Sequence, residues 1–193
     1  MSQAMIGRRD SPEQFAEDEG KFRELMLLII EKSQDDPGFG STKLNKLLFA
    51  IDLFSYGITG EPITGFRYVK RQYGPAPAKL PQVRRKMIAE QELALQDVRS
   101  FGYTQKRPMA LRPSDVRRFS APEMALIDNV IRVFRGANAS QISEWSHGLC
   151  GWAIAEKDTD IPYEVVFLSD KRMTAYEAER GRQLALERGW DVF

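Results

Sequence analysis

The sequence predicts a helix-dominated α+β fold, a compact helical domain with a small antiparallel β-sheet of about three strands. Several long segments repeat apolar residues every three or four positions, which is the spacing of a buried helix face. Shorter runs alternate apolar and polar residues as half-buried strands do, and turns rich in Gly or Pro separate them. With 193 residues, the chain is long enough to build one substantial core without disulfide bonds.

Two helices open the predicted domain. After a loose tail at residues 1–10, Ser11 as N-cap and Pro12 at the first helical position favour a helix that lasts until a turn containing Pro and Gly. The second helix covers residues 43–57 and is expected to end at Gly57. Apolar side chains occupy most of its circumference, so it is predicted to lie at the centre of the fold.

The predicted strands lie in the middle of the chain. Residues 63–74 alternate as a half-buried strand that ends in the sequence Tyr-Gly-Pro, and a helix over residues 78–90 follows. Two shorter strand-like runs, at 93–100 and 109–113, are expected to complete the sheet. A loop is predicted between them.

The C-terminal half is predicted to be mostly helical. A capping box opens a helix at 120–136, a shorter helix covers 140–148, and a last helix runs from about 173 to 189. Apart from the N-terminal tail, we therefore expect one domain over residues 11–168 and a helical extension over residues 169–193.

The Tyr-Gly-Pro corner is predicted to be structural. Gly74 can adopt a positive φ without steric penalty, and Pro75 fixes its own φ at about −65°. The corner lies inside a local basic region, residues 62–89, which contains no carboxylate. Because the whole chain has a net charge of only +1, an electrostatic function would depend on such local clustering.

Composition favours a cytoplasmic protein. The single cysteine, Cys150, cannot form an internal disulfide and suits a reducing compartment. No run approaches the ~18 consecutive apolar residues that would suggest a membrane span. We therefore expect no membrane partner.

A catalytic or metal site is not expected. His147 is the only histidine; it follows Ser146 and precedes Cys150 by three residues, so a hydrolase would depend on a Ser–His or Cys–His pair here. No nucleophile signature flanks these residues, and a structural position at a helix end is the simpler interpretation. Metal-ligand spacing and a phosphate-binding loop are also missing from the sequence. We assign no catalytic, metal-binding or cofactor-binding residue.

Two kinds of binding remain open. The basic residues within 67–86 could contact nucleic-acid phosphates, but the balanced charge of the chain disfavours this interpretation. Aromatic residues with arginine nearby are typical anchors of protein interfaces. The residues predicted to bind a partner are Tyr68, Lys70, Arg71, Tyr73, Lys79, Arg84, Trp145 and Trp152.

The order of short motifs along the chain resembles that of a known family. That family typically shows a K-L-x-K-L-L helix, a T-G-x-P-I-T-G turn, a Y-G-P corner and a later L-S-H…W…I-P-Y run. The corresponding positions here are Lys43–Leu48, Thr59–Gly65, Tyr73–Pro75, Trp145–His147 with Trp152, and Ile161–Tyr163. Over about residues 22–168, the chain resembles the Panacea domain of the SocA-like antitoxins, although Trp145 replaces the usual leucine before Ser-His.

The resemblance implies a non-enzymatic protein of a bacterial or phage toxin–antitoxin pair, with a connection to phage defence. Such a protein neutralises a cognate toxin by direct binding, and some family members present the toxin to a protease as adaptors. A nucleic-acid-binding regulator that uses residues 67–86 is the alternative, and a homo-oligomer stays open. The expected structural motif residues are Gly74, Pro75, Ser146, His147, Pro162 and Tyr163.

Overall fold

The computed structural model describes most of the chain, namely residues 15–100, 103–168, 175–176, 179 and 182–183. The predicted tail at 1–10 and the predicted helix start at Ser11 and Pro12 lie outside these residues. Of the last predicted helix, at 173–189, only a few residues are described, and their backbone is helical.

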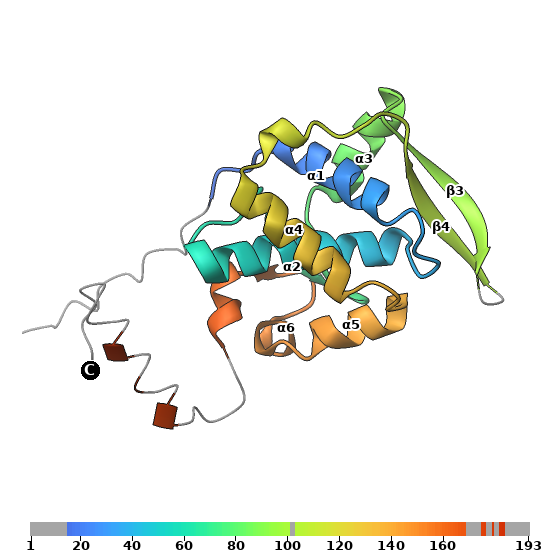
Figure 1. The fold of residues 1–193 in the computed structure, drawn as a ribbon. Coiled ribbons are helices and arrows are strands. Elements are labelled where there is room, and N and C mark those ends of the chain that lie inside the picture. Colours follow the sequence, from blue (N-terminus) through green and yellow to red (C-terminus); the bar gives the residue numbers. More distant parts are fainter. Residues whose placement is uncertain (1–14, 101–102, 169–174, 177–178, 180–181, 184–193) are drawn as a thin grey trace, which may run out of the picture.

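Helix α2 (Ser41–Thr59) runs through the middle of the fold (Figure 1). It is buried along most of its length, as its apolar sequence predicts. The other elements pack around it. Its neighbours are α1 (Glu19–Lys32), α4 (Ala121–Val133), α5 (Ala139–His147), β2 (Gly74–Pro77) and the 3₁₀ helix η2 (Tyr163–Phe167).

The first two helices begin and end at residues other than the predicted ones. Residues 15–18 are not helical, and α1 starts only after Asp18, whose carboxylate accepts a hydrogen bond from the backbone N–H of Lys21 (2.8 Å). Helix α2 continues through Gly57 and ends before Gly60. The φ of +82° at Gly60 is a left-handed conformation, which explains why glycine closes the helix there.

A three-stranded antiparallel sheet lies beside α2. Its central strand β1 (Tyr68–Arg71) pairs with β2 on one side and with β5 (Asp160–Ile161) on the other. The predicted strand at 63–74 is therefore shorter than expected. The corner at Gly74 begins a strand that the sequence did not predict, because it contains two prolines. Proline is tolerated here because β2 is an edge strand.

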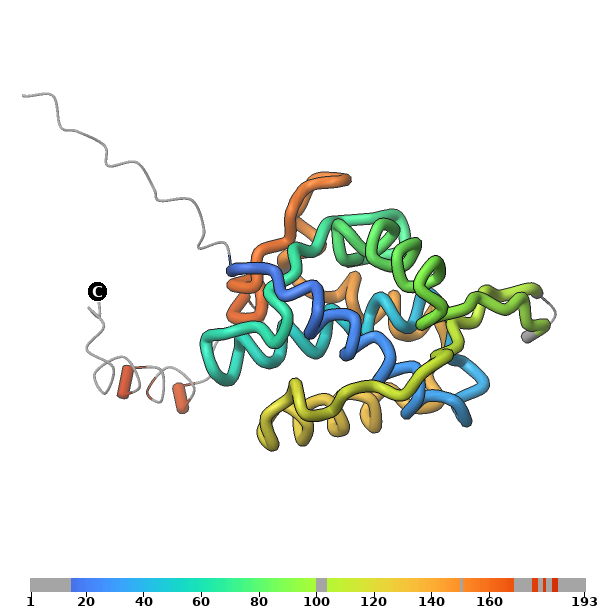
Figure 2. The backbone as a smooth tube through the Cα atoms, turned by 90° about the horizontal axis from the view of Figure 1, so that it is seen from above, coloured from blue at the N-terminus to red at the C-terminus, as the bar shows by residue number. Residues whose placement is uncertain are grey.

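A second sheet consists of the hairpin β3 (Leu93–Ser100) and β4 (Tyr103–Ala110). Figure 2 shows this hairpin projecting away from the helices. The first strand was predicted correctly, whereas the second was placed too late, at 109–113, because polar residues and Pro108 precede it. Small antiparallel sheets are thus confirmed, but this hairpin is separate from the sheet that contains β1.

The remaining helices confirm a helix-dominated α+β fold. Helix α3 (Leu80–Ala89) buries its apolar face as predicted, and capping boxes at Ser120 and Asn138 open α4 and α5. Two short elements complete the fold, the 3₁₀ helix η1 (Val116–Arg118) and α6 (Cys150–Ile154). Within the described part of the chain, no helix is both long enough and apolar enough to cross a membrane.

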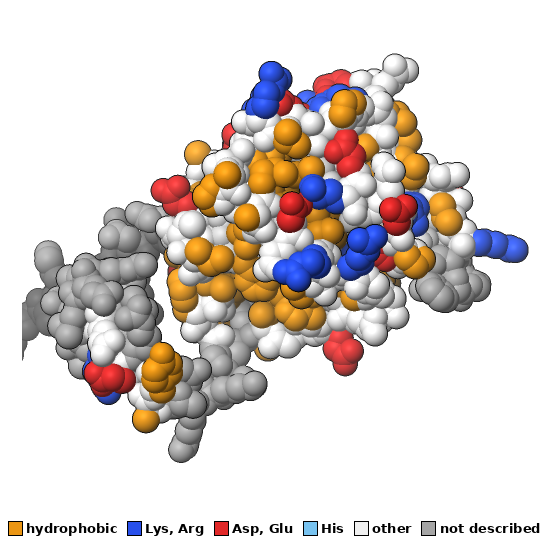
Figure 3. Space-filling view, in the orientation of Figure 1, with side chains coloured by type: hydrophobic (Ala, Val, Ile, Leu, Met, Phe, Trp, Pro, Cys, Tyr) orange, Lys and Arg blue, Asp and Glu red, His pale blue; other side chains and the backbone are white. Residues whose placement is uncertain are grey.

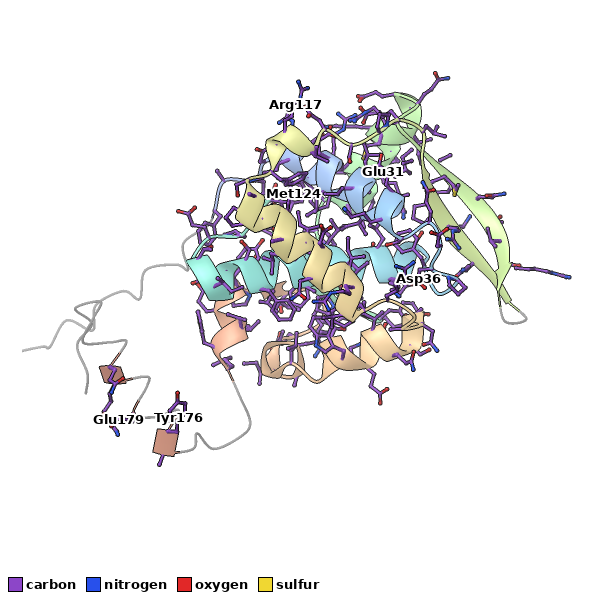
Figure 4. All side chains as sticks on the ribbon, in the orientation of Figure 1. Glu31, Asp36, Arg117, Met124, Tyr176 and Glu179 are labelled. Atoms are coloured by element: carbon purple, nitrogen blue, oxygen red, sulfur yellow. The ribbon has the colours of Figure 1, made fainter. Side chains whose placement is uncertain are left out.

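Helix α2 carries three buried charged residues, with exposed fractions of 1% for Lys43, 2% for Lys46 and 0% for Asp52. Lys43 Nζ pairs with Asp36 (2.6 Å) in the loop between α1 and α2 (Figure 4). Asp52 accepts hydrogen bonds from neighbouring side chains. Lys46 has no carboxylate partner among the described residues, and an unpaired buried charge is costly. Lys46 is therefore the natural centre of a candidate site.

Candidate functional site

Separate sequence motifs meet at the side chain of Lys46. Its Nζ, on α2, donates a hydrogen bond to the carbonyl oxygen of Pro75 (2.8 Å) in the Tyr-Gly-Pro corner. Gly74 has a φ of +96°, and a Cβ placed on it would lie 2.7 Å from Lys46 Nζ and 2.6 Å from Ser146 Oγ. Only glycine fits this position without displacing a neighbour. The α2 motif, the corner and the Ser-His motif on α5 are therefore packed against one another.

No carboxylate among the described residues pairs with the ammonium group of Lys46. Burial lowers the pKa of Lys46 to about 7, because the charged form loses its hydration. Lys43, one helical turn earlier, is equally buried but pairs with Asp36. Near neutral pH, Lys46 is therefore partly protonated, and any charge that it carries has only a backbone carbonyl as its partner among the described residues.

Two stacked rings and a second lysine extend this cluster. The rings of His147 and Trp152 lie nearly parallel, with centroids 3.9 Å apart and planes inclined by 16°. Lys70 Nζ lies 4.2 Å from the Trp152 ring centroid and donates a hydrogen bond to the Ala155 carbonyl (2.9 Å). Burial, followed by the positive charges of Lys46 and Lys70, lowers the pKa of His147 and so favours its neutral imidazole.

The geometry does not support a nucleophile at Ser146. Its buried Oγ donates to the Ser143 carbonyl (2.7 Å), while the His147 ring stacks on Trp152. The side chain of Cys150 lies outside the part of the chain that the structure describes. Among the described residues, no three or more His, Cys, Asp or Glu side chains gather as a metal site.

Tyr68, which the sequence suggested as a partner contact, belongs instead to the core. Its side chain is 1% exposed, and its hydroxyl donates to Asp52 Oδ2 (2.8 Å). Asp52 also accepts hydrogen bonds from Thr64, and burial raises its pKa to about 6 in spite of them. Tyr163 packs against Tyr68 and donates to the Phe66 carbonyl (2.6 Å). These residues hold the sheet onto α2.

Acids from distant segments neutralise most of the basic region. Two of these acids lie just before and at the start of α1, and the other two lie just before and within β5. The absence of a carboxylate within residues 62–89 therefore does not make the folded surface basic. Lys70 and Arg84 have no ion-pair partner among the described residues. A nucleic-acid backbone would meet these acids as well as the bases, which weakens the nucleic-acid interpretation. The ion pairs are Arg67–Asp160, Arg71–Asp158, Lys79–Glu17 and Lys86–Glu19.

The predicted aromatic contacts divide between two places. Tyr73 stands at the corner with 66% of its surface exposed, whereas Trp152 is half-buried under Lys70. Trp145 is also half-buried, and its ring packs between those of Phe54 and Phe134, with centroids 6.0 and 4.8 Å away. Helix α5 therefore directs Trp145 away from the place where Lys46, Gly74 and Ser146 meet.

Trp145 lines an apolar groove of about 520 Å³ between α2, α4 and η2. Ile58, Val133 and Phe167 line it as well, and 68%, 67% and 65% of their surfaces are exposed. Figure 3 shows apolar side chains gathered on this face of the molecule. Apart from Trp145, sequence reasoning missed these residues, because each sits within or just after a helix whose other apolar residues are core. Only the three-dimensional fold brings them together.

The sequence matches the model of a known protein family. The family model described as antitoxin SocA-like, Panacea domain, matches residues 44–153, more than half of the chain. The chain belongs to this family. The matched segment contains Lys46, the Tyr-Gly-Pro corner, the Ser-His motif and Trp152. Among curated proteins and solved structures, none matches the chain.

Proposed function

We propose that the protein is the antitoxin of a toxin–antitoxin pair and neutralises its cognate toxin by direct binding. Membership of the SocA-like antitoxin family is the observation that carries the proposal. Such a binder needs no catalytic residue, which agrees with the hydrogen bond of Ser146 to a backbone carbonyl. In this proposal, residues 11–168 form the binding domain and residues 169–193 form a helical extension.

We propose that the toxin binds in the apolar groove. Trp145 lies among aromatic rings at its wall, and Ile58, Val133 and Phe167 offer exposed apolar area. Apolar side chains that enter such a groove supply most of the affinity of a protein interface, whereas charges at its rim mainly speed association. The exposed corner around Tyr73 is the second contact region.

Co-expression with the product of the neighbouring gene tests this function. We expect that product to stop growth when expressed alone, and we expect the present protein to restore growth and to co-purify with it. A harmless neighbour, or rescue without a detectable complex, would show that direct neutralisation is the wrong mechanism.

Paired variants test the groove. Val133→Asp places a charge among apolar side chains and should abolish both rescue and co-purification, because an interface does not bury an unpaired carboxylate cheaply. Leu111→Asp is the matched control: Leu111 is 55% exposed and does not line the groove. Both variants should keep the wild-type melting temperature. If Val133→Asp rescues as well as the control does, the toxin binds elsewhere.

The lifetime of the toxin separates simple inhibition from delivery to a protease. An antitoxin that only blocks the toxin leaves its level unchanged during rescue, whereas an adaptor shortens its half-life. Pulse–chase labelling of the toxin, with and without the antitoxin, distinguishes the two mechanisms.

A further inference from the structure

Lys70 is an unneutralised charge on a strand whose other basic residue is paired. Arg71, the next residue on β1, pairs with Asp158, and Arg67, just before the strand, pairs with Asp160. Lys70 Nζ instead donates to a backbone carbonyl and lies over the Trp152 ring. No carboxylate among the described residues pairs with it.

Two ring nitrogens beside Lys70 also lack a hydrogen-bond partner in the described part of the chain. Trp152 Nε1 and His147 Nε2 are buried, and neither has a hydrogen-bond partner among the described residues. Lys46 and Lys70 are both close enough to His147 to disfavour its protonation by their charge. Lys46 itself has only the Pro75 carbonyl as acceptor. Four groups that can donate or carry positive charge thus share one place, and none of them pairs with an acid among the described residues.

We propose that Lys70, His147 and Trp152 form a receptor for a single carboxylate, supplied by an acidic side chain of the toxin. A carboxylate accepts several hydrogen bonds at once and binds most strongly to charged donors. Lys70 Nζ lies over the indole ring, so a carboxylate that binds Lys70 also comes near the unpartnered ring nitrogens of Trp152 and His147. The inference deepens the proposed function, since it names the chemistry of one contact that the toxin makes.

The surroundings select one acid rather than a polyanion. Asp158 and Asp160 hold exposed carboxylates next to β1, and Glu156 is exposed in the turn before them. Nucleic acid carries a negative charge at every phosphate, so a strand laid over Lys70 would also approach these acids. A lone acidic side chain on a protein surface carries a single charge and can meet Lys70 with less of that repulsion.

The single histidine offers a direct test that needs no toxin. The full-length protein has one imidazole, so one Cε1–H signal in the proton NMR spectrum reports on this site. We expect acetyl-Gly-Glu-Gly-amide, titrated in low salt, to shift that signal with saturation, and acetyl-Gly-Gln-Gly-amide to leave it in place. Lys70→Met should weaken the apparent affinity by about tenfold, the scale of a lost charge-assisted contact. Lys106→Met, on the exposed face of β4, is the control and should bind as wild type does.

Three outcomes would overturn the proposal. One is an equal response to the glutamate and glutamine peptides, and another is unchanged affinity in Lys70→Met. The third is a saturable shift with a short single-stranded DNA oligonucleotide but not with the glutamate peptide, which would make the site a phosphate site. Because the toxin is absent from the titration, failure here leaves the rescue experiment intact, and failure of rescue leaves the carboxylate site intact.

Discussion

The Cα of Gly74 lies so close to Lys46 that a β-carbon would come within 2.7 Å of the lysine Nζ. The same β-carbon would lie 2.6 Å from Ser146 Oγ, and Gly74 has a left-handed φ of +96°. The corner thus approaches α2 and α5 closely enough for Pro75 to accept the lysine's hydrogen bond. This single glycine joins three motifs that are far apart in the sequence.

We predict that Gly74→Ala destabilises the domain by about 1–3 kcal/mol, because it adds both steric conflict and a strained φ. Gly136→Ala is the matched control: its φ is also positive, at +80°, but nothing lies within 4 Å of its β-carbon. Urea denaturation should show a clearly smaller loss for Gly136→Ala. Equal losses would mean that the close approach to Lys46 contributes nothing.

Lys46 should make stability depend on pH above neutrality. Its pKa in the folded protein is lowered to about 7, so the unfolded chain binds more protons between about pH 7 and 10. The free energy of unfolding should therefore rise with pH, by on the order of 2 kcal/mol from pH 7 to pH 9. Lys46→Met should remove this rise in urea denaturation. A rise that persists in the variant would assign it to other groups.

Asp52 should make the free energy of unfolding fall as the pH rises toward neutrality, the opposite of the effect of Lys46. Its pKa in the folded protein is raised to about 6, so the folded state binds more protons than the unfolded chain between about pH 4 and 6. Acidification from pH 7 to pH 5 should therefore add stability through this group, on the order of 1 kcal/mol, and the gain is lost as pH rises through 6. Asp52→Asn, compared at both pH values by thermal unfolding, should lack the gain. The same gain in the variant would contradict the assignment.

Binding to nucleic acid should be weak and sensitive to salt. Four bases of the basic region are paired with acids of this chain, which leaves few free charges for phosphates. In fluorescence anisotropy, any binding to duplex DNA should disappear near about 0.15 M salt. Sequence-specific binding that survives at that salt concentration would favour a regulator.

The comparison between sequence and structure shows what local patterns can and cannot predict. Helical periodicity and capping predicted α2, α3, α4 and α5, because these signals lie within each segment. Strand β2 escaped prediction because proline obscures an edge strand. The alternation that marks β1 as a strand also places Tyr68 on its buried side, in the core of the domain.

The candidate site was harder to predict than the fold. Sequence reasoning found Gly74, Ser146 and Trp152 as motif or partner residues, but it could not show that they surround Lys46, which comes from a helix many residues earlier. It also found no carboxylate within the basic region, residues 62–89, and could not show which acids would pair with it. The neutralising acids are remote in sequence, and only folding brings them to Arg67, Arg71, Lys79 and Lys86.

The pairing of β5 with β1 has a consequence for how the chain acquires its structure. The central strand receives one neighbour from the adjacent corner and the other from residues 160–161, near the end of the described fold. Closing so long a loop has a large entropic cost, and contacts between distant residues slow folding. During synthesis, β1 therefore keeps an open edge until β5 is made. For that interval, the nascent chain can recruit other strands, and an early partner would act on it as a folding template.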